Sequence, residues 1–295
     1  MTTTTLDHTV ETQEQQDFVD SIIAAVKELP PMPQVVFKIQ ELLLDPNSNA
    51  RQIADLVETD QAIATKVLKM ANSSYYGMSS RVTSVQHAAV ILGNKALAEL
   101  TTIAGFSNLL GKKLPGYRYN SDELWKHSLA VALIAVRIAE RIIPEYVNEA
   151  LTAGLIHDIG KLILDPYVEE KSEMFSEIME GGDQTFRSAE KQILGLDHAE
   201  IASEVCRVWN FPELLTLSIK YHHCPSRSNG NIMAFIVHLA DYIAVLSGSG
   251  YDIDDILYTL EEGTEEFLDV HQSDVLSVAP AIIDSIHRIE EELAV

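Results

Sequence analysis

Apolar residues recur at intervals of three and four along most of this 295-residue chain, and this spacing gives an α-helix one apolar face. Val35, Ile39 and Leu42 show the pattern in one short stretch. No stretch of any length alternates apolar and polar residues in the way that marks a half-buried strand. The sequence therefore predicts an all-α fold.

Composition divides the chain into four parts. A segment rich in Gly, Lys and Pro at residues 111–120 interrupts the helical pattern and is the best candidate for a boundary between two helical regions. We predict a disordered leader over residues 1–17, where Thr, Gln and Glu dominate. An N-terminal helical subdomain follows over residues 18–115, and a second one over residues 116–250. Acidic helices are expected over residues 251–295.

The charge balance excludes some classes of partner. The chain carries 21 basic and 44 acidic residues, a net charge of −23, and such a charge repels nucleic acid and anionic membranes. The helices expected near residues 53–57 and 63–71 could be mistaken for a DNA-binding pair, but their basic residues stand beside acidic ones and form no positive face. Binding to DNA or to a membrane is therefore not expected.

Other features bear on the cellular compartment. No apolar run reaches the roughly 18 residues needed to span a bilayer, and the polar, acidic start does not resemble a signal peptide. The two cysteines, Cys206 and Cys224, form neither a CxxC motif nor a disulfide framework. These features predict a protein of the cytoplasm, where thiols stay reduced.

The stretch at residues 149–161 is the most informative for function. It is typical of an apolar helix that carries two adjacent polar side chains, His157 and Asp158. Burying an imidazole and a carboxylate without partners costs a few kcal/mol each, and a shared cation would satisfy both. Gly160 would let the backbone turn or pack closely, and Lys161 could direct its ammonium toward an anion held by the cation. On its own, the pair fits a buried hydrogen bond equally well.

Further imidazoles and carboxylates lie on the predicted helices of the second subdomain. Helical bundles build metal sites from inward-facing side chains on neighbouring helices. Imidazole with carboxylate, without thiolate, suits Fe, Mn, Zn or Ni. Because eight ligands exceed what one ion needs, we expect two divalent cations. The candidate ligands are Glu123, His127, His157, Asp158, His198, His222, His223 and Asp241.

Each candidate also has an ordinary structural explanation. Glu123 could be a first-turn carboxylate at a helix N-terminus, and His127, one turn later, a surface histidine. His198 could simply begin a helix, and the imidazoles of His222 and His223 could interact with the negative end of a helix dipole. Their joint occurrence on otherwise apolar helices favours the metal-site hypothesis.

Several motifs are shared with a known family. The metal-site motifs are His127 with Ser128, residues 155–161, His198, His222 with His223, and Asp241. The motifs upstream of the metal site are residues 29–33, Asp60, residues 71–73, Tyr76 with Gly77, and residues 88–93. The motifs in the second subdomain are Glu190, Leu194 with Gly195, residues 209–212 and residues 221–223. Over residues 29–246 the chain resembles the HDOD family (HD-related output domain) of the HD superfamily of metal-dependent phosphohydrolases, with its metal-site motifs most similar to the HD-GYP branch.

The resemblance implies an N-terminal helical bundle packed on an HD-type helical bundle. HDOD proteins are bacterial modules of signalling and regulation, and many lack the metal-binding residues that this chain keeps. After His223 the chain continues with Cys224 and Pro225 and has no Gly-Tyr-Pro segment. Since that segment is expected to form part of the substrate wall in HD-GYP enzymes, hydrolysis of cyclic di-GMP is not implied.

Two functional hypotheses follow. The first is a regulatory signalling module with a retained two-metal site, whose partners are signalling proteins that bind the N-terminal helices or the acidic C-terminal helices. The alternative is a metal-dependent phosphohydrolase acting on a nucleotide or a cyclic dinucleotide.

In the alternative, Asp158 bridges the two ions, and Lys161 neutralises charge on the phosphoryl oxygens. These two residues would be catalytic. Fe or Mn is the expected metal, with Zn and Ni as alternatives. One ion would be held by His127, His157, Asp158 and Asp241, and the other by Asp158, His198, His222 and His223.

Overall fold

The computed structural model describes residues 5–45, 48–73, 81–249, 258–277 and 279–293. Helices and turns make up these residues, and their one strand-like feature is an isolated bridge between Leu114 and Tyr119. The all-α prediction is confirmed. No helix within the described ranges has the length and apolar character to cross a bilayer. The Tyr76–Gly77 motif, the first four residues and residues 250–257 of the expected C-terminal part lie outside these ranges.

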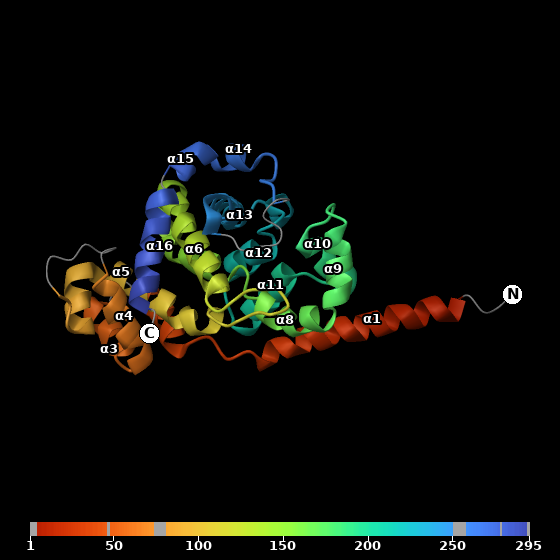
Figure 1. The fold of residues 1–295 in the computed structure, drawn as a ribbon. Coiled ribbons are helices and arrows are strands. Elements are labelled where there is room, and N and C mark those ends of the chain that lie inside the picture. Colours follow the sequence, from red (N-terminus) through yellow and green to blue (C-terminus); the bar gives the residue numbers. More distant parts are fainter. Residues whose placement is uncertain (1–4, 46–47, 74–80, 250–257, 278, 294–295) are drawn as a thin grey trace.

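The helices follow one another in a single globular arrangement from which α1 projects (Figure 1). In chain order they are α1 (Thr5–Ala25), α2 (Gln34–Leu44), α3 (Ala50–Val57), α4 (Gln61–Ala71), α5 (Val85–Leu110), α6 (Glu123–Ile142), α7 (Val147–Ile156), α8 (Lys161–Glu170), α9 (Ser172–Glu180), α10 (Phe186–Leu194), α11 (His198–Val208), α12 (Glu213–Lys220), α13 (Ile232–Ala244), α14 (Thr264–Leu268), α15 (Gln272–Leu276) and α16 (Ala279–Leu293). Shorter 3₁₀ segments stand at Val26–Glu28, Pro144–Tyr146 and Pro225–Ser228, and a π segment at Val245–Ser249.

The N-terminal part differs from the expected disordered leader. Helix α1 begins at Thr5 and continues without a break to Ala25. Side-chain hydrogen bonds one turn apart support it, from Gln13 to Asp17 at 2.8 Å and from Gln16 to Asp20 at 2.9 Å. Such pairs stabilise an exposed helix by a few tenths of a kcal/mol each, an effect that composition alone does not reveal.

Three helices form the framework of the second subdomain. Helix α7 packs along α6, and α13 packs against both. Their contact faces are apolar, and α7 is buried from Ala150 through Ile156. Gly154 permits the close approach, because a Cβ at this position would overlap the backbone of Ala132 on α6. The end of α7, the first turns of α6 and the C-terminal part of α13 come together, because Asp241 of α13 lies beside His127 of α6 and His157 after α7.

The two predicted subdomains share one apolar core. Helices α2, α3 and α4 pack on α5, which in turn contacts α6 and α7. Helix α16 contacts both α4 and α6, with Ile282, Ile286 and Ile289 buried at helical spacing. The buried apolar residues on both sides of the predicted boundary form one contiguous cluster. The C-terminal helices are thus packed elements with an apolar inner face.

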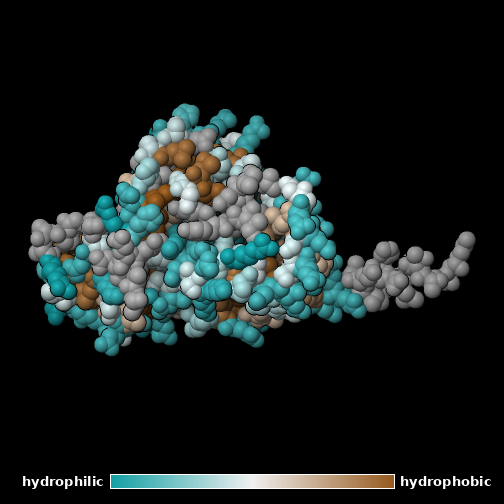
Figure 2. Space-filling view, in the orientation of Figure 1, coloured by the Kyte–Doolittle hydropathy of each residue, from teal (hydrophilic) through white to brown (hydrophobic). Residues whose placement is uncertain are grey.

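The visible surface is mostly hydrophilic, as the acidic composition requires (Figure 2). A hydrophobic area lies toward the top of this view, in the region of α14 and α15. Phe267 of α14 is 46% exposed, and its ring stacks on Phe235 of α13 with the centroids 3.9 Å apart. This contact fixes α14 to the framework.

We expect Gly154→Ala to destabilise the protein by about 1–3 kcal/mol, because the added methyl group overpacks the contact between α7 and α6. Gly181→Ala, at the exposed end of α9, serves as the control and should change the free energy of unfolding by less than about 0.5 kcal/mol. Urea denaturation of the two variants measures both values. Equal stability of the two variants would contradict the proposed close packing.

Candidate metal centre

The structure brings together all of the predicted ligands except Glu123. They come from five places in the chain, which meet where α6, α7 and α13 converge. His127 lies on α6, Asp241 on α13 and His198 at the first position of α11. His157 and Asp158 follow α7, and His222 and His223 follow α12. All are buried except His223, which is partly exposed.

His157 and Asp158 stand in a turn rather than within a helix. Helix α7 ends at Ile156, and α8 begins at Lys161, so the expectation of one continuous helix through these residues was wrong. Gly160 packs against the first turn of α11, because a Cβ there would overlap the backbone carbonyl of His198. The glycine is therefore required for close packing, and it brings Asp158 next to His198.

The first group of ligands surrounds one oxygen of Asp158. Its Oδ2 atom lies 3.4 Å from Nε2 of His157 and 3.8 Å from Nε2 of His127. Oδ1 of Asp241 lies 3.1 Å from Nε2 of His127 and 3.9 Å from Nε2 of His157. Two imidazoles and two carboxylates thus surround one small volume.

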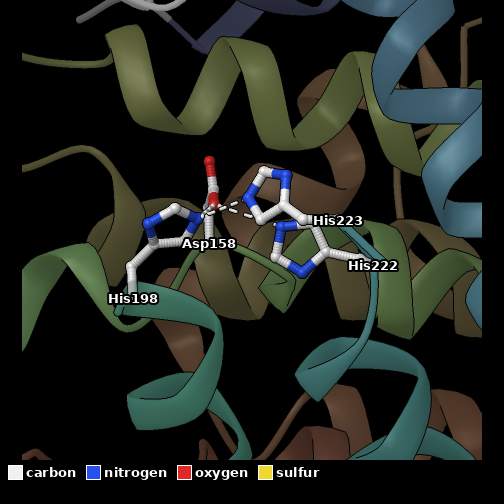
Figure 3. Close-up of side chains that lie close together, drawn as sticks. All are labelled: Asp158, His198, His222 and His223. Carbon is white, nitrogen blue, oxygen red and sulfur yellow. Dashed lines mark hydrogen bonds and ion pairs between the residues drawn. The ribbon is translucent and has the colours of Figure 1, made fainter. Parts of the chain in front are cut away.

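The second group surrounds the other oxygen of Asp158. Its Oδ1 atom lies 3.3 Å from Nε2 of His198 and 3.9 Å from Nε2 of His222. Nε2 of His223 is 2.8 Å from Nε2 of His198. In Figure 3 the Asp158 carboxylate stands between His198 on one side and His222 with His223 on the other. One carboxylate therefore offers an oxygen to each group, which is the geometry of a bridging ligand.

Backbone hydrogen bonds orient two of the imidazoles. Nδ1 of His157 donates to the carbonyl of Gly154 at 2.8 Å, and Nδ1 of His222 donates to the carbonyl of Ile219 at 2.7 Å. The Nε2 lone pair of each ring then faces the centre, as in metal sites generally.

These atoms provide a direct test of whether a metal fits. Among the described residues, Nε2 of His157, Nε2 of His222 and Oδ1 of Asp158 are buried without a hydrogen-bond partner. An unsatisfied buried polar atom costs about 1–3 kcal/mol. Cations in the two groups would satisfy all three atoms, so the residues fit a divalent metal centre.

Glu190 is a site residue that was not among the predicted ligands. It is fully buried on α10, and its Oε2 atom accepts hydrogen bonds from Nδ1 of His198 at 2.8 Å and from the His198 amide at 3.0 Å. Tyr117 donates its hydroxyl to Oε1 at 2.5 Å. Glu190 thus fixes the orientation of His198, a role that carboxylates often take behind metal-binding histidines. The sequence signal was a carboxylate on the apolar face of a helix.

Lys161 places its ammonium at the edge of the centre. Its Nζ atom lies 2.8 Å from Oδ2 of Asp158 and 3.4 Å from the hydroxyl of Tyr119. The rings of Tyr117 and Tyr119 have their centroids 5.8 and 5.5 Å from Nζ, within the range of cation–π attraction. The two residues predicted to be catalytic, Asp158 and Lys161, are therefore adjacent.

Glu123 lies outside the centre. Its carboxylate accepts hydrogen bonds from the Asn120 amide at 2.6 Å and from the Asn120 side chain at 2.9 Å. Glu123 and His127 lie one turn apart on α6, as predicted. The hydrogen bonds from Asn120 in the preceding loop hold the Glu123 carboxylate away from the centre. Its interactions are those of an ordinary carboxylate at a helix N-terminus.

The histidines of the centre differ in pKa. Burial alone would lower the pKa of His127, but the Asp241 and Asp158 carboxylates outweigh it and raise the pKa to about 9. In the same way, Glu190 and Asp158 overcome burial and raise the pKa of His198 to about 9. Burial and the neighbouring His157 lower the pKa of His222 to about 3. Without a metal at neutral pH, His127 and His198 are protonated, and His222 is neutral.

We expect the metal-free protein to lose stability between about pH 6.5 and pH 9. A histidine whose pKa is raised by folding stabilises the protein fully below its unfolded pKa, and this contribution is lost as pH rises through the folded pKa. For His127 and His198 the rise from 6.5 to about 9 corresponds to about 3 kcal/mol each at most. Urea denaturation of chelator-treated protein at both pH values measures the loss.

Glu190→Gln should reduce this loss, because it removes one of the charges that raise the pKa of His198. Glu177→Gln, on the exposed face of α9, is the control and should behave like the wild type. Wild-type protein with the same free energy of unfolding at both pH values would contradict the assignment.

Comparison with protein families identifies the HDOD domain over residues 29–225. Among curated proteins, an uncharacterised protein of Treponema pallidum is 24% identical over 204 residues, which is 69% of this chain and 39% of that relative. This chain therefore spans well under half the length of that relative.

Solved structures share the fold. An HDOD domain protein of unknown function from Geobacter sulfurreducens has a TM-score of 0.79 and 25% identity, over 96% of this chain and 100% of its own. A candidate phosphohydrolase from Shewanella amazonensis has a TM-score of 0.72 and 20% identity, over 92% and 98%. A candidate signal-transduction protein from Marinobacter aquaeolei has a TM-score of 0.73 and 22% identity, over 95% and 66%. Because the family model covers well over half of the sequence and the fold agrees, this chain belongs to the HDOD family.

Proposed function

We propose that this protein is a regulatory HDOD protein of a bacterial signalling system whose centre holds two divalent cations. The metal part of the proposal rests on three buried atoms that have no hydrogen-bond partner within the described part of the chain, which are Nε2 of His157, Nε2 of His222 and Oδ1 of Asp158. His127, His157 and Asp241 would hold one cation, and His198, His222 and His223 the other, with Asp158 between them. Fe or Mn is the proposed metal, because the donors are imidazole and carboxylate.

The observation that favours regulation over turnover is the lack of room at the centre. The space open to water among Asp158, Lys161, His198, Asp241 and Tyr258 is only about 20 Å³, enough for roughly one water molecule. A complete set of candidate ligands with so little open space in this arrangement fits a structural or sensing metal centre. The Marinobacter aquaeolei protein is named as a signal-transduction protein, which agrees with this proposal. Signalling proteins are the proposed partners.

Protein purified without a chelator should carry about two divalent cations per chain. Asp158→Ala should lose both, because its two oxygens face the two groups, whereas His198→Ala should lose mainly one. Elemental analysis measures the metal content. His271→Ala, which removes a side chain that is 85% exposed, is the control and should retain the wild-type content. A metal-free wild type, or an Asp158→Ala variant with full metal content, would contradict the proposal.

A second candidate function is phosphoester hydrolysis, and the position of Lys161 favours it. Bound cations would supply Lewis acidity toward a phosphoryl group and the attacking water. The ammonium of Lys161, 2.8 Å from Asp158, would neutralise charge on the phosphoryl oxygens, and Glu190 would keep the proton on Nδ1 of His198. Since the chain has a net charge of −23, an anionic substrate gains no long-range attraction, and these local charges would have to bind it.

A turnover assay separates the two candidates. Metal-loaded protein is tested with bis(4-nitrophenyl) phosphate, nucleotides and cyclic dinucleotides. The regulatory proposal expects a rate equal to that of Asp158→Ala. The hydrolase candidate expects a higher rate, which Lys161→Met should lower by about 10²–10³-fold. Lys112→Met, at an exposed position, is the control and should leave that rate unchanged. Turnover that depends on both Asp158 and Lys161 would overturn the purely regulatory proposal.

A further inference from the structure

A segment beyond the family match covers the pocket at the metal centre. Residues 258–262, here called the strap, follow the matched residues 29–225 and precede α14. Tyr258 lines the pocket together with Asp158, Lys161 and Asp241. Its ring packs edge-on against the ring of His223, with the centroids 5.5 Å apart. The phenol therefore occupies space that a ligand of the centre would need.

Polar contacts hold the strap in this position. The amide of Glu261 donates to Nε2 of His238 at 2.9 Å. The carboxylate of Glu261 accepts hydrogen bonds from the amide of Ser226 at 2.9 Å and from its hydroxyl at 2.8 Å. Ser226 belongs to the turn that follows His222 and His223, so the strap is fastened beside the imidazoles of the second group.

One imidazole links the strap directly to this group. Nε2 of His238 accepts the hydrogen bond from the Glu261 amide, and Nδ1 donates a hydrogen bond to the backbone carbonyl of His222 at 2.7 Å. Both ring nitrogens are thus used, which explains why His238 lies beside the centre without facing it. Displacement of the strap would leave Nε2 of His238 without this donor.

The contacts of the strap allow it to move separately from α14. The hydrogen bonds between Glu261 and Ser226 lie at the exposed surface, where water can replace them. Gly263 separates the strap from α14 and has a φ of +86°, a conformation that glycine adopts readily. Helix α14 itself stays fixed through the stacked rings of Phe267 and Phe235. Bending at Gly263 would break the hydrogen bond from the Thr264 amide to the Glu261 carbonyl at 3.2 Å and would move Leu260 away from the edge of the apolar core, while α14 stays in place.

We propose that Tyr258 is the gate of the metal centre, and that the contact of Glu261 with Ser226 keeps it closed. If the centre holds cations, as the proposed function states, any ligand larger than water reaches them only when the strap is displaced. This consequence rests on the proposed function. The ligand class is an anionic phosphoryl compound, because Lys161 and the two groups of ligands face the position of the phenol. A partner that displaces the strap would then control access to the centre.

The first test needs no metal. Full-length protein treated with chelator is reacted with diethyl pyrocarbonate, and mass spectrometry follows the modification of His223 relative to that of the exposed His271. Tyr258→Ala and Glu261→Ala should each increase the relative rate at His223 by about tenfold or more, because opening of the strap no longer limits access. Glu262→Ala, an exposed neighbour, is the matched control and should react like the wild type.

Tyr258→Ala and Glu261→Ala open the strap in different ways. Tyr258→Ala removes the plug itself, and Glu261→Ala removes a contact at the surface, where loss of the side chain leaves the core intact. Melting temperatures close to that of the wild type would show that neither change acts by unfolding. Rates at His223 within about twofold of the wild-type rate in both variants would overturn the gate.

The second test uses metal-loaded protein. Release of the metal to excess EDTA should be about tenfold faster in Tyr258→Ala than in the wild type, with Glu262→Ala unchanged. Equal release rates for Tyr258→Ala and the wild type would also overturn the gate. A wild type that binds no metal would refute the proposed function alone, since the modification of His223 decides the gate independently.

Discussion

The interaction on which the site depends is the placement of one buried carboxylate between two groups of imidazoles. Asp158 is 2% exposed, and burial would raise its pKa, but the charges of Lys161 and His157 lower the pKa well below its usual value. The carboxylate is therefore ionised in a place where an isolated anion would be strongly unfavourable. Its two oxygens face different groups of ligands, so the whole centre is organised around this one side chain.

The framework around Asp158 is built to keep this arrangement rigid. Gly154 permits the contact of α7 with α6, and Gly160 permits the contact of the following turn with α11. At the start of α11, the Asp197 side chain accepts from the Glu200 amide, and the Glu200 side chain accepts from the Asp197 amide. This capping box makes His198 the first residue of the helix. Glycines and a helix cap thus position the ligands.

The sequence predicted most of the fold and most of the candidate site, for identifiable reasons. Helical spacing indicates helices wherever one face is buried. Histidines and carboxylates on apolar helices are conspicuous, which is why His127, His198 and Asp241 could be selected. The assignment of Asp158 as a bridge came from the family resemblance rather than from spacing. Glu123 shows the limit of spacing, because a hydrogen bond from the neighbouring Asn120 decides where its carboxylate lies.

Two other site residues were not assigned to the centre from the sequence. Glu190 holds His198 from a separate helix, and nothing in the spacing of α10 indicates which imidazole it meets. Tyr258 precedes α14 in the C-terminal part, which was predicted only as acidic helices that bind partners. The apolar residues Leu268, Ile282 and Ile286 of this part pack back onto the bundle. Both positions depend on long-range packing. Residues 1–17 were predicted to be a disordered leader, whereas α1 begins at Thr5. Hydrogen bonds between side chains one turn apart support this helix.

The strap connects the two halves of the functional proposal. A centre with a complete set of candidate ligands and little open space would be difficult to explain as an enzyme site. It would be equally difficult to explain as a remnant, since two of its buried nitrogens and one oxygen have no hydrogen-bond partner among the described residues. A closed metal centre with a movable cover accounts for both observations. It also gives the C-terminal part of the chain a role at the centre.

The most direct test of the central claim is a crystal structure of metal-loaded protein with anomalous scattering recorded at the edge of the bound metal. The account predicts two anomalous peaks, each about 2.0–2.2 Å from a different oxygen of Asp158. No peak at this position, or a single peak that does not contact Asp158, would contradict it.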